Sequence, residues 1–158
     1  MRTAGQLPKR GEVVVFRRPD GDGKAMFRVI GLPGDKIAVN SGQLTLNGIR
    51  VARAPQGTIR RQVPERWETL SVYSETLPEG LSYEVAESPT PGRFDEIPET
   101  AVAAGAIYVL GDNRDYADDS RSAQLGDIPL DHIVGRVVFR LRPDPSWLVP
   151  PETVPGLG

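Results

Sequence analysis

Residues 24–35 read KAMFRVIGLPGD, an apolar stretch that runs into a Pro-Gly turn and an aspartate. Short apolar runs that stop at turn residues are typical of β-strands. Pro33 fixes its own φ near the value that a turn needs, and Gly34 accepts a left-handed φ, so we expect a tight turn directly after the strand. Residues 12–16, EVVVF, form a second β-branched run, and RRPDGDG separates the two runs. The sequence therefore predicts a β-hairpin at this place.

The next stretch continues the pattern of short strands and turns. Residues 35–51 alternate apolar and polar side chains, and they contain Ser41-Gly42 and Asn47-Gly48. Both dipeptides suit tight hairpin turns, because glycine accepts positive φ at little cost. The 17 Gly and 15 Pro of the chain favour turns and short strands over long helices. We expect a mostly β fold.

Further strands are predicted toward the end of the chain. Residues 105–122 start with a buried-looking strand and continue as a turn-rich acidic loop, and residues 133–141 form another strand-like run. Helix is suggested only at residues 101–106 and by a turn near Leu130.

A length of 158 residues suits a single core, so we expect one β domain over residues 1–145. We interpret part of the stretch from about residue 52 to residue 100 as an inserted flap. Residues 52–69 are polar, Arg-rich and without a clear period of apolar side chains. Residues 146–158 are expected to form an irregular C-terminal tail.

Composition excludes several classes of function. A formal net charge of −2 gives no electrostatic reason to expect a nucleic-acid partner. The absence of cysteine excludes disulfides, zinc thiolate sites and a cysteine nucleophile. No apolar run is long enough to span a bilayer, and the N-terminus MRTAGQLPKRGE has no apolar signal core, so this polypeptide is expected neither to span a membrane nor to export itself. No cofactor is expected.

The acidic loop is interpreted as an ion-paired turn rather than as a metal site. Its spacing does not match the calcium-loop pattern, and neighbouring arginines offer partners for the carboxylates. His132 is the only histidine and lies away from any nucleophile pattern, so we expect a surface or strand-edge imidazole. The charged residues of the loop are Asp112, Arg114, Asp115, Asp118, Asp119 and Arg121.

Four stretches in a fixed order carry a family resemblance over most of the chain. They are LPKRGEVVVFRRP at 7–19, FRVIGLPGDKI at 27–37, ETLPEGLSYEV at 75–85, and VLGDNRDYADDSR followed by IVGR at 109–136. Together they resemble the type I signal peptidases, membrane-bound Ser/Lys endopeptidases that cut signal peptides from exported proteins. The resemblance implies a mostly β fold with two antiparallel sheet regions, and a site on the periplasmic or extracytoplasmic face of the cytoplasmic membrane.

The resemblance also implies a catalytic pair that this sequence lacks. In the family a serine is activated by a neutral lysine, whose pKa is lowered by burial in apolar surroundings. That lysine directly precedes the arginine of the RVIGLPGD-type motif, where this chain has Phe27. The family serine lies in a Ser-Met-x-Pro segment before PKRGEVVVF, and none of the eight serines here has that context. Ala117 stands where many members have a serine that bonds the lysine, and Lys24 is expected to point to the opposite face from Phe27.

The resemblance implies that the chain keeps the family's scaffold and its substrate groove. The groove would be lined by Val15, Ala25, Met26 and Phe27, along which an extended peptide adds by backbone hydrogen bonds. Arg28 with Asp112, and Asp119 with Arg121, are expected to form structural ion pairs. The other structural positions beside the site are Gly31, Pro33, Gly34, Asp35, Gly111, Asn113, Arg114, Asp115 and Ser120.

Three functions remain open from the sequence. The chain is either an inactive homologue that binds signal peptides or preprotein segments, a truncated active peptidase core that lacks its serine segment and N-terminal membrane anchor, or a generic β interaction module. Phe27 favours the inactive homologue over the truncated enzyme, because trimming a chain cannot replace an internal lysine. A membrane contact would then be made through the missing N-terminal anchor.

Overall fold

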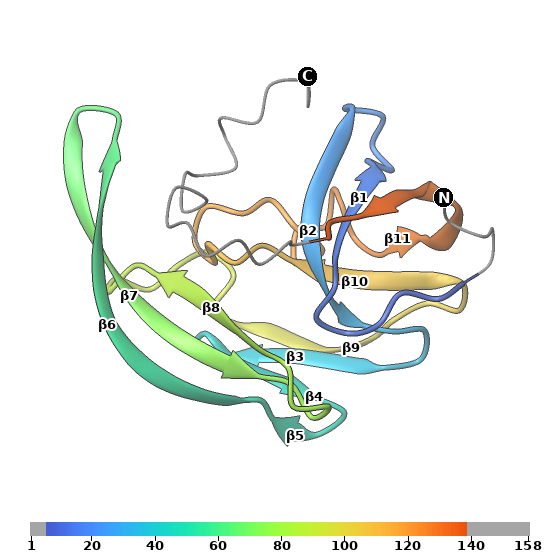
Figure 1. Ribbon diagram of the computed structural model, residues 1–158, viewed down its shortest axis with the longest axis horizontal. Helices are drawn as coiled ribbons and strands as arrows, with labels where there is room; N and C mark the ends of the chain where they lie inside the picture. The colour runs from blue at the N-terminus through green and yellow to red at the C-terminus, as the bar shows by residue number, and fades with distance from the viewer. Residues whose placement is uncertain (1–5, 139–158) are drawn as a thin grey trace.

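The computed structural model describes residues 6–138, which form twelve β-strands and one short 3-10 helix. The prediction of a mostly β fold built from antiparallel sheets is confirmed. Hydrogen bonding divides the strands into three sheets (Figure 1). No helix in this part of the chain is long and apolar enough to cross a membrane.

The first sheet contains the predicted hairpin. In spatial order its strands are β11 (Ile128–Pro129), β10 (Ala106–Leu110), β2 (Lys24–Gly31), β1 (Val13–Arg17) and β12 (Ile133–Arg136). All neighbours are antiparallel, and β1 pairs with β2 from Val13 opposite Arg28 to Arg17 opposite Lys24. β10 pairs with β2 only from Arg28 to Gly31. The first half of β2 therefore has β1 as its only strand partner among the described residues.

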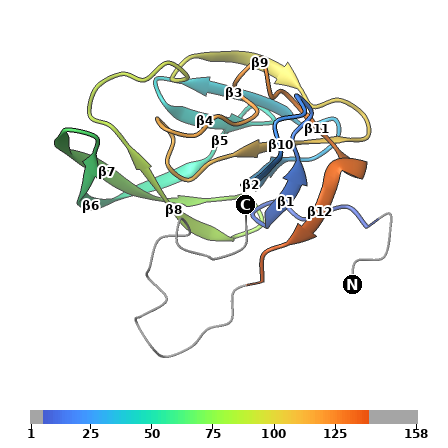
Figure 2. The ribbon, with the colours of Figure 1, turned by 90° about the horizontal axis from the view of Figure 1, so that it is seen from above.

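The other two sheets hold the middle of the chain. One has the order β5 (Ile49–Arg50), β4 (Gln43–Leu46), β3 (Lys36–Asn40) and β9 (Ile97–Ala101). The other has the order β6 (Ala52–Val63), β7 (Arg66–Thr76) and β8 (Ser82–Glu87). Figure 2 shows the sheet of β6, β7 and β8 beside the five-stranded sheet, with the turn between β6 and β7 farthest from it.

Residues 52–69, which show no period in the sequence, belong to the regular strands β6 and β7 except for the turn at residues 64–65. Most side chains of β6 are exposed on both faces, so no alternation marks the strand. β6 is held in place by backbone hydrogen bonds to β7 rather than by burial of one of its faces. The helix suggested at residues 101–106 is wrong, because β9 ends at Ala101 and a turn leads into β10 at Ala106.

The turn near Leu130 is a 3-10 helix at Leu130–His132, as the sequence suggested. Residues 139–158, which include the predicted irregular tail, lie outside the described residues.

Two apolar cores lie on the two faces of the five-stranded sheet. The larger core joins β2, β3, β4, β8 and β10, with Ile30, Ile37 and Leu110 almost fully buried. The smaller core lies on the other face of the five-stranded sheet, where Phe16 and Val29 meet the loop after β10. β2 therefore separates the two cores, and side chains that alternate along it enter one or the other.

Candidate functional site

Phe27 lies on the smaller core's face of the β1/β2 hairpin. It stands opposite Val14 in the register, and its ring centroid is 6.2 Å from that of Phe16. Val14 and Phe16 are fully buried, and Phe27 packs against them half-buried. An aromatic ring at position 27 therefore continues the apolar core to the surface.

Gly111 and Ala117 close the space next to the Phe27 ring. A Cβ atom on Gly111 would lie 2.2 Å from the Ala117 Cβ and 3.2 Å from the Phe27 Cε1. The backbone N–H of Ala117 donates to the Asn113 carbonyl at 3.0 Å, which turns the loop back onto β10. Phe27 and Ala117 thus both lie next to Gly111, and we call these three residues the Phe27 seat.

No amine side chain reaches the Phe27 seat. The chain has three lysines, at positions 9, 24 and 36. Lys24 stands opposite Arg17 and alternates with Phe27 onto the other face of β2, and Lys36 lies in β3 of a different sheet. Lys9 precedes β1 and is exposed.

The four residues expected to line one groove lie on two faces of the hairpin. Val15 and Met26 are register partners on one face. Ala25 stands opposite Phe16 and packs, like Phe27, against the smaller core on the other face. A single extended peptide on one face can therefore contact only two of the four.

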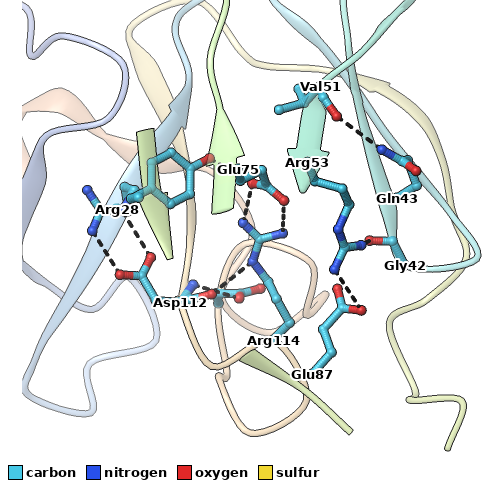
Figure 3. A network of polar contacts seen from close by, with 12 residues as sticks. Arg28, Gly42, Gln43, Val51, Arg53, Glu75, Glu87, Asp112 and Arg114 are labelled. Carbon is cyan, nitrogen blue, oxygen red and sulfur yellow. Dashed lines mark hydrogen bonds and ion pairs between the residues drawn. The ribbon is translucent and has the colours of Figure 1, made fainter. Parts of the chain in front are cut away.

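Arg28 joins β2 to the loop after β10. Its Nε is 2.9 Å from Asp112 Oδ1, and its Nη2 is 2.8 Å from Asp112 Oδ2. Nη1 donates to the Gly11 carbonyl at 2.7 Å, and the guanidinium stacks 4.4 Å from the Tyr83 ring centroid. This is the pair that the sequence analysis expected, and Figure 3 shows it beside a second ion pair.

That second pair joins Arg114 to Glu75 and was not expected from the sequence. Arg114 Nη2 is 2.6 Å and Nη1 is 3.2 Å from the two Glu75 carboxylate oxygens (Figure 3). Tyr83 donates from its hydroxyl to Glu75 Oε1 at 2.7 Å. Burial disfavours the Arg114 charge, but the Glu75 carboxylate outweighs this and holds the arginine pKa above its ordinary value. Burial, and then the Glu75 charge, raise the pKa of Tyr83.

The rest of the acidic loop folds under β10. Asp119 is fully buried and accepts hydrogen bonds from the Gly111 N–H at 3.0 Å and from Arg121 Nε at 2.8 Å. Ser120 Oγ accepts from the Val109 N–H at 2.9 Å. These bonds hold the loop against β10, and Asp119 with Arg121 is the ion pair that was expected from the sequence.

The turn after β2 is held by Asp35. Gly34 has a φ of 84°, which an L side chain rarely adopts, and the Gly31 backbone approaches the Tyr108 side chain so closely that a Cβ would lie 2.9 Å from it. Burial opposes ionisation of Asp35, yet hydrogen bonds from Asn47 Nδ2, the Leu32 N–H and Arg10 outweigh it and keep the carboxyl pKa below its ordinary value. Pro33 lies within this turn.

Comparison with known proteins places the chain in a family. A family model described as "Signal peptidase, peptidase S26" matches residues 2–142. The chain belongs to this S26 signal peptidase family. It is 35% identical over 147 residues to a signal peptidase I of Rickettsia typhi (strain ATCC VR-144 / Wilmington), covering 87% of this chain and 53% of the relative.

Other similar proteins agree with the S26 assignment. Signal peptidase I of Rickettsia canadensis (strain McKiel) is 35% identical over 141 residues, covering 84% of this chain and 51% of the relative. The S26 chain thus spans about half the length of the curated relatives that it matches. A crystal structure of a signal peptidase I from Enterococcus faecalis V583 aligns with a TM-score of 0.50 and 20% identity, over 84% of this chain and 98% of that chain, and supports the fold alone.

Two further contacts of the S26 chain were not expected from the sequence. Arg18 Nη2 lies 3.2 Å from Asp118 Oδ2, which joins the end of the β1/β2 hairpin to the acidic loop. Asp115 accepts from the Ser88 N–H and ties the same loop to the chain after β8. The excess of arginine and aspartate in both segments is a signal for ion pairs, but it does not select the partners.

Metal ligation finds no support in the described part of the S26 chain. No group of three or more histidine, aspartate or glutamate side chains there could hold an ion. The His132 Nδ1 lies 3.0 Å from the Arg17 carbonyl, which puts this half-buried imidazole beside the end of β1.

Proposed function

We propose that this S26 chain is a catalytically inactive family member that binds signal-peptide-like segments without cutting them. The observation that carries the proposal is Phe27, packed against Phe16 in the seat that the family resemblance assigns to the general-base lysine. A phenyl ring has no atom that can accept a proton from a serine hydroxyl. Ala117, which lies next to Gly111 in the Phe27 seat, has no hydroxyl to orient an amine.

The missing base cannot be replaced from nearby. Ser/Lys chemistry needs an amine within hydrogen-bond reach of the serine, with its pKa lowered by burial. All three lysines of the chain lie away from the Phe27 seat, on another face, in another sheet or before β1. The general base would be missing wherever a serine segment came from.

An open backbone edge supports peptide binding. β10 pairs with β2 only from Arg28 onward, so residues 24–27 have no strand partner on that side within the described range. Extended peptides add to such edges by main-chain hydrogen bonds, with alternate side chains entering pockets. The peptide side chains that point to the face of Ala25 and Phe27 would meet an apolar surface, where the small Ala25 side chain leaves room for an apolar residue of the ligand.

We also propose a cellular location for this binding. Signal peptides are presented at the outer surface of the cytoplasmic membrane, so the chain would act on its periplasmic or extracytoplasmic face. Family membership supports this location.

The test uses the whole chain and a fluorescent peptide with an Ala-x-Ala sequence. We expect saturable binding by fluorescence anisotropy, and an intact peptide by mass spectrometry after long incubation in detergent. Ala25→Glu should abolish binding, because it places a charge on the apolar face of the edge. Ala38→Glu is the matched control, since Ala38 is also a half-buried strand alanine but lies in β3.

Two outcomes would overturn the proposal in different ways. Specific cleavage after the second alanine by the unmodified chain would show an active enzyme. Equal binding by the unmodified chain and Ala25→Glu, or no binding by either, would remove the peptide-binding role.

A further inference from the structure

The turn between β6 and β7 carries exposed side chains that the candidate site does not use. Residues 59–67, here called the hairpin tip, read IRRQVPERW. Gln62 stands opposite Trp67 and Val63 opposite Arg66, and Pro64-Glu65 make the turn. Figures 1 and 2 both show this turn standing clear of the other strands. The hairpin tip is therefore accessible to another molecule or to a membrane.

Large apolar side chains project from both faces of the hairpin tip. Trp67 is 59% exposed and Ile59 is 49% exposed. The register places Ile59 and Val63 on one face and Trp67 on the other, together with Arg60. A flat protein surface could cover only one of these faces. A surrounding medium that is apolar on all sides can cover both.

The hairpin tip is cationic although the whole chain is not. It contains three arginines and one glutamate, whereas the chain has a formal net charge of −2. Arg60 and Arg66 are exposed and form no ion pair with a carboxylate in the region that the structure describes. The Arg60 guanidinium lies 5.1 Å from the Trp67 ring centroid. Cationic heads thus stand next to exposed aromatic and aliphatic groups.

We propose that the hairpin tip docks on a lipid bilayer that contains anionic phospholipids. Tryptophan prefers the level of the headgroups, where its ring is apolar and its N–H stays hydrated. Arginines beside it can extend to the phosphates while their stems remain in apolar surroundings. Such a contact covers both faces of the ribbon at once. The proposal goes beyond peptide binding and does not rest on it.

The base of the hairpin tip is fixed to the body of the protein. Tyr116 donates from its hydroxyl to Glu68, and the Arg61 guanidinium lies 5.0 Å from the Tyr116 ring centroid. Tyr116 belongs to the acidic loop that also holds Ala117 of the Phe27 seat. Docking of the tip would therefore set the distance and orientation of the peptide edge relative to the membrane.

The experiment is vesicle flotation with the whole chain. One set of vesicles contains phosphatidylcholine alone, and the other contains equal parts of phosphatidylcholine and phosphatidylglycerol. We expect binding to the anionic vesicles to be at least about fivefold stronger, and to weaken as salt is added, because the arginines act through screened charge.

Two double variants separate the apolar and the cationic contributions. Ile59→Ser with Trp67→Ser, and Arg60→Gln with Arg66→Gln, should each reduce binding to anionic vesicles by about fivefold or more. Ile49→Ser is the matched control, because Ile49 is 69% exposed in β5 at the opposite end of β6, and it should bind as the unmodified chain does. Circular dichroism verifies that all variants fold.

A spectroscopic measurement reports the tip directly. The chain has two tryptophans, so Trp147→Phe leaves Trp67 as the only indole. Its emission should shift to shorter wavelength when anionic vesicles are added. Equal vesicle binding by both double variants and the unmodified chain, or an unchanged Trp67 emission at saturating lipid, would overturn the proposal, as would a failure to bind either vesicle.

Discussion

Glu75 and Arg114 form a two-point ion pair inside the protein, with side chains that are only 1% and 5% exposed. Glu75 lies at the end of β7 and Arg114 in the acidic loop, so the pair connects the three-stranded sheet to the loop that forms the Phe27 seat. Tyr83 adds a hydrogen bond to the same carboxylate.

Glu75→Gln should destabilise the protein strongly. The change leaves the buried Arg114 guanidinium without a counter-charge, which costs about 3 to 5 kcal/mol of unfolding free energy. Urea unfolding followed by circular dichroism measures it. A loss below about 1 kcal/mol would show that water reaches the guanidinium and that the pair contributes as a surface pair does.

Asp112→Ala should cost less than Glu75→Gln, although Asp112 also forms a two-point pair. The Asp112 side chain is 42% exposed, so water can replace part of its contact with Arg28. We expect a loss of about 1 to 2 kcal/mol, between the values for surface and buried pairs. Thermal melts of the two variants in the same buffer give the comparison, and an unchanged melting temperature for Asp112→Ala would contradict the prediction.

Phe27→Lys should lower stability and leave peptide cleavage at background. The ring packs on Phe16, and its replacement by a charged chain loses about 1 to 3 kcal/mol of apolar burial. Groups that act as a catalytic unit return almost nothing when one is restored alone. Unfolding curves and mass spectrometry of an Ala-x-Ala substrate give the two readouts. Phe27→Leu, which keeps an apolar side chain, should lose less stability than Phe27→Lys.

Gly111→Ala should destabilise the Phe27 seat through a direct clash. The new Cβ would lie 2.2 Å from the Ala117 Cβ, and the overpacking should cost about 1 to 3 kcal/mol. In an Ala117→Gly background the same change should cost less, because the clashing atom is gone. A double-mutant cycle by urea unfolding tests this coupling. Additive losses would show that the loop moves away at no cost.

The lowered pKa of Asp35 should make the stability of the protein depend on pH in the acid range. Its pKa is lower in the folded chain than the ordinary value of about 3.9. Its contribution is therefore complete above that value and is lost as the pH falls through the folded pKa. Asp35→Asn should be less stable than the unmodified chain at neutral pH, and the difference should shrink at about pH 3. An equal difference at both pH values would assign the effect to geometry alone.

The parts of the fold that follow from local pattern were predictable. Pro33-Gly34 fixed a turn, and the β-branched runs on either side of RRPDGDG fixed a hairpin, because both depend on neighbours in the sequence. The Arg28 and Asp112 partnership came from the family resemblance. Alternation along β2 alone puts Ala25 and Phe27 on one face and Met26 on the other. Only the face of Val15 depends on the register of β1 against β2, in which Val15 stands opposite Met26.

Other contacts had no local signal. Glu75 and Arg114 are 39 positions apart, and only the packing of β7 against the acidic loop brings them together. β6 was not recognised because most side chains on both of its faces are exposed, so no apolar and polar positions alternate along it. A strand of this kind is specified by its partner, and a single sequence does not show the partner.

The pairing of β1 with β12 has a consequence for the time at which the protein can fold. Arg136 binds Glu12, 124 positions earlier in the chain. Translation at roughly 5 to 20 residues per second separates the appearance of these two residues by several seconds or more. During that interval β1 can pair with β2, but its other edge stays open to neighbouring nascent chains. The second edge of β1 is therefore enclosed only after β12 has been made, and a chaperone that shields β1 should raise the yield of native protein.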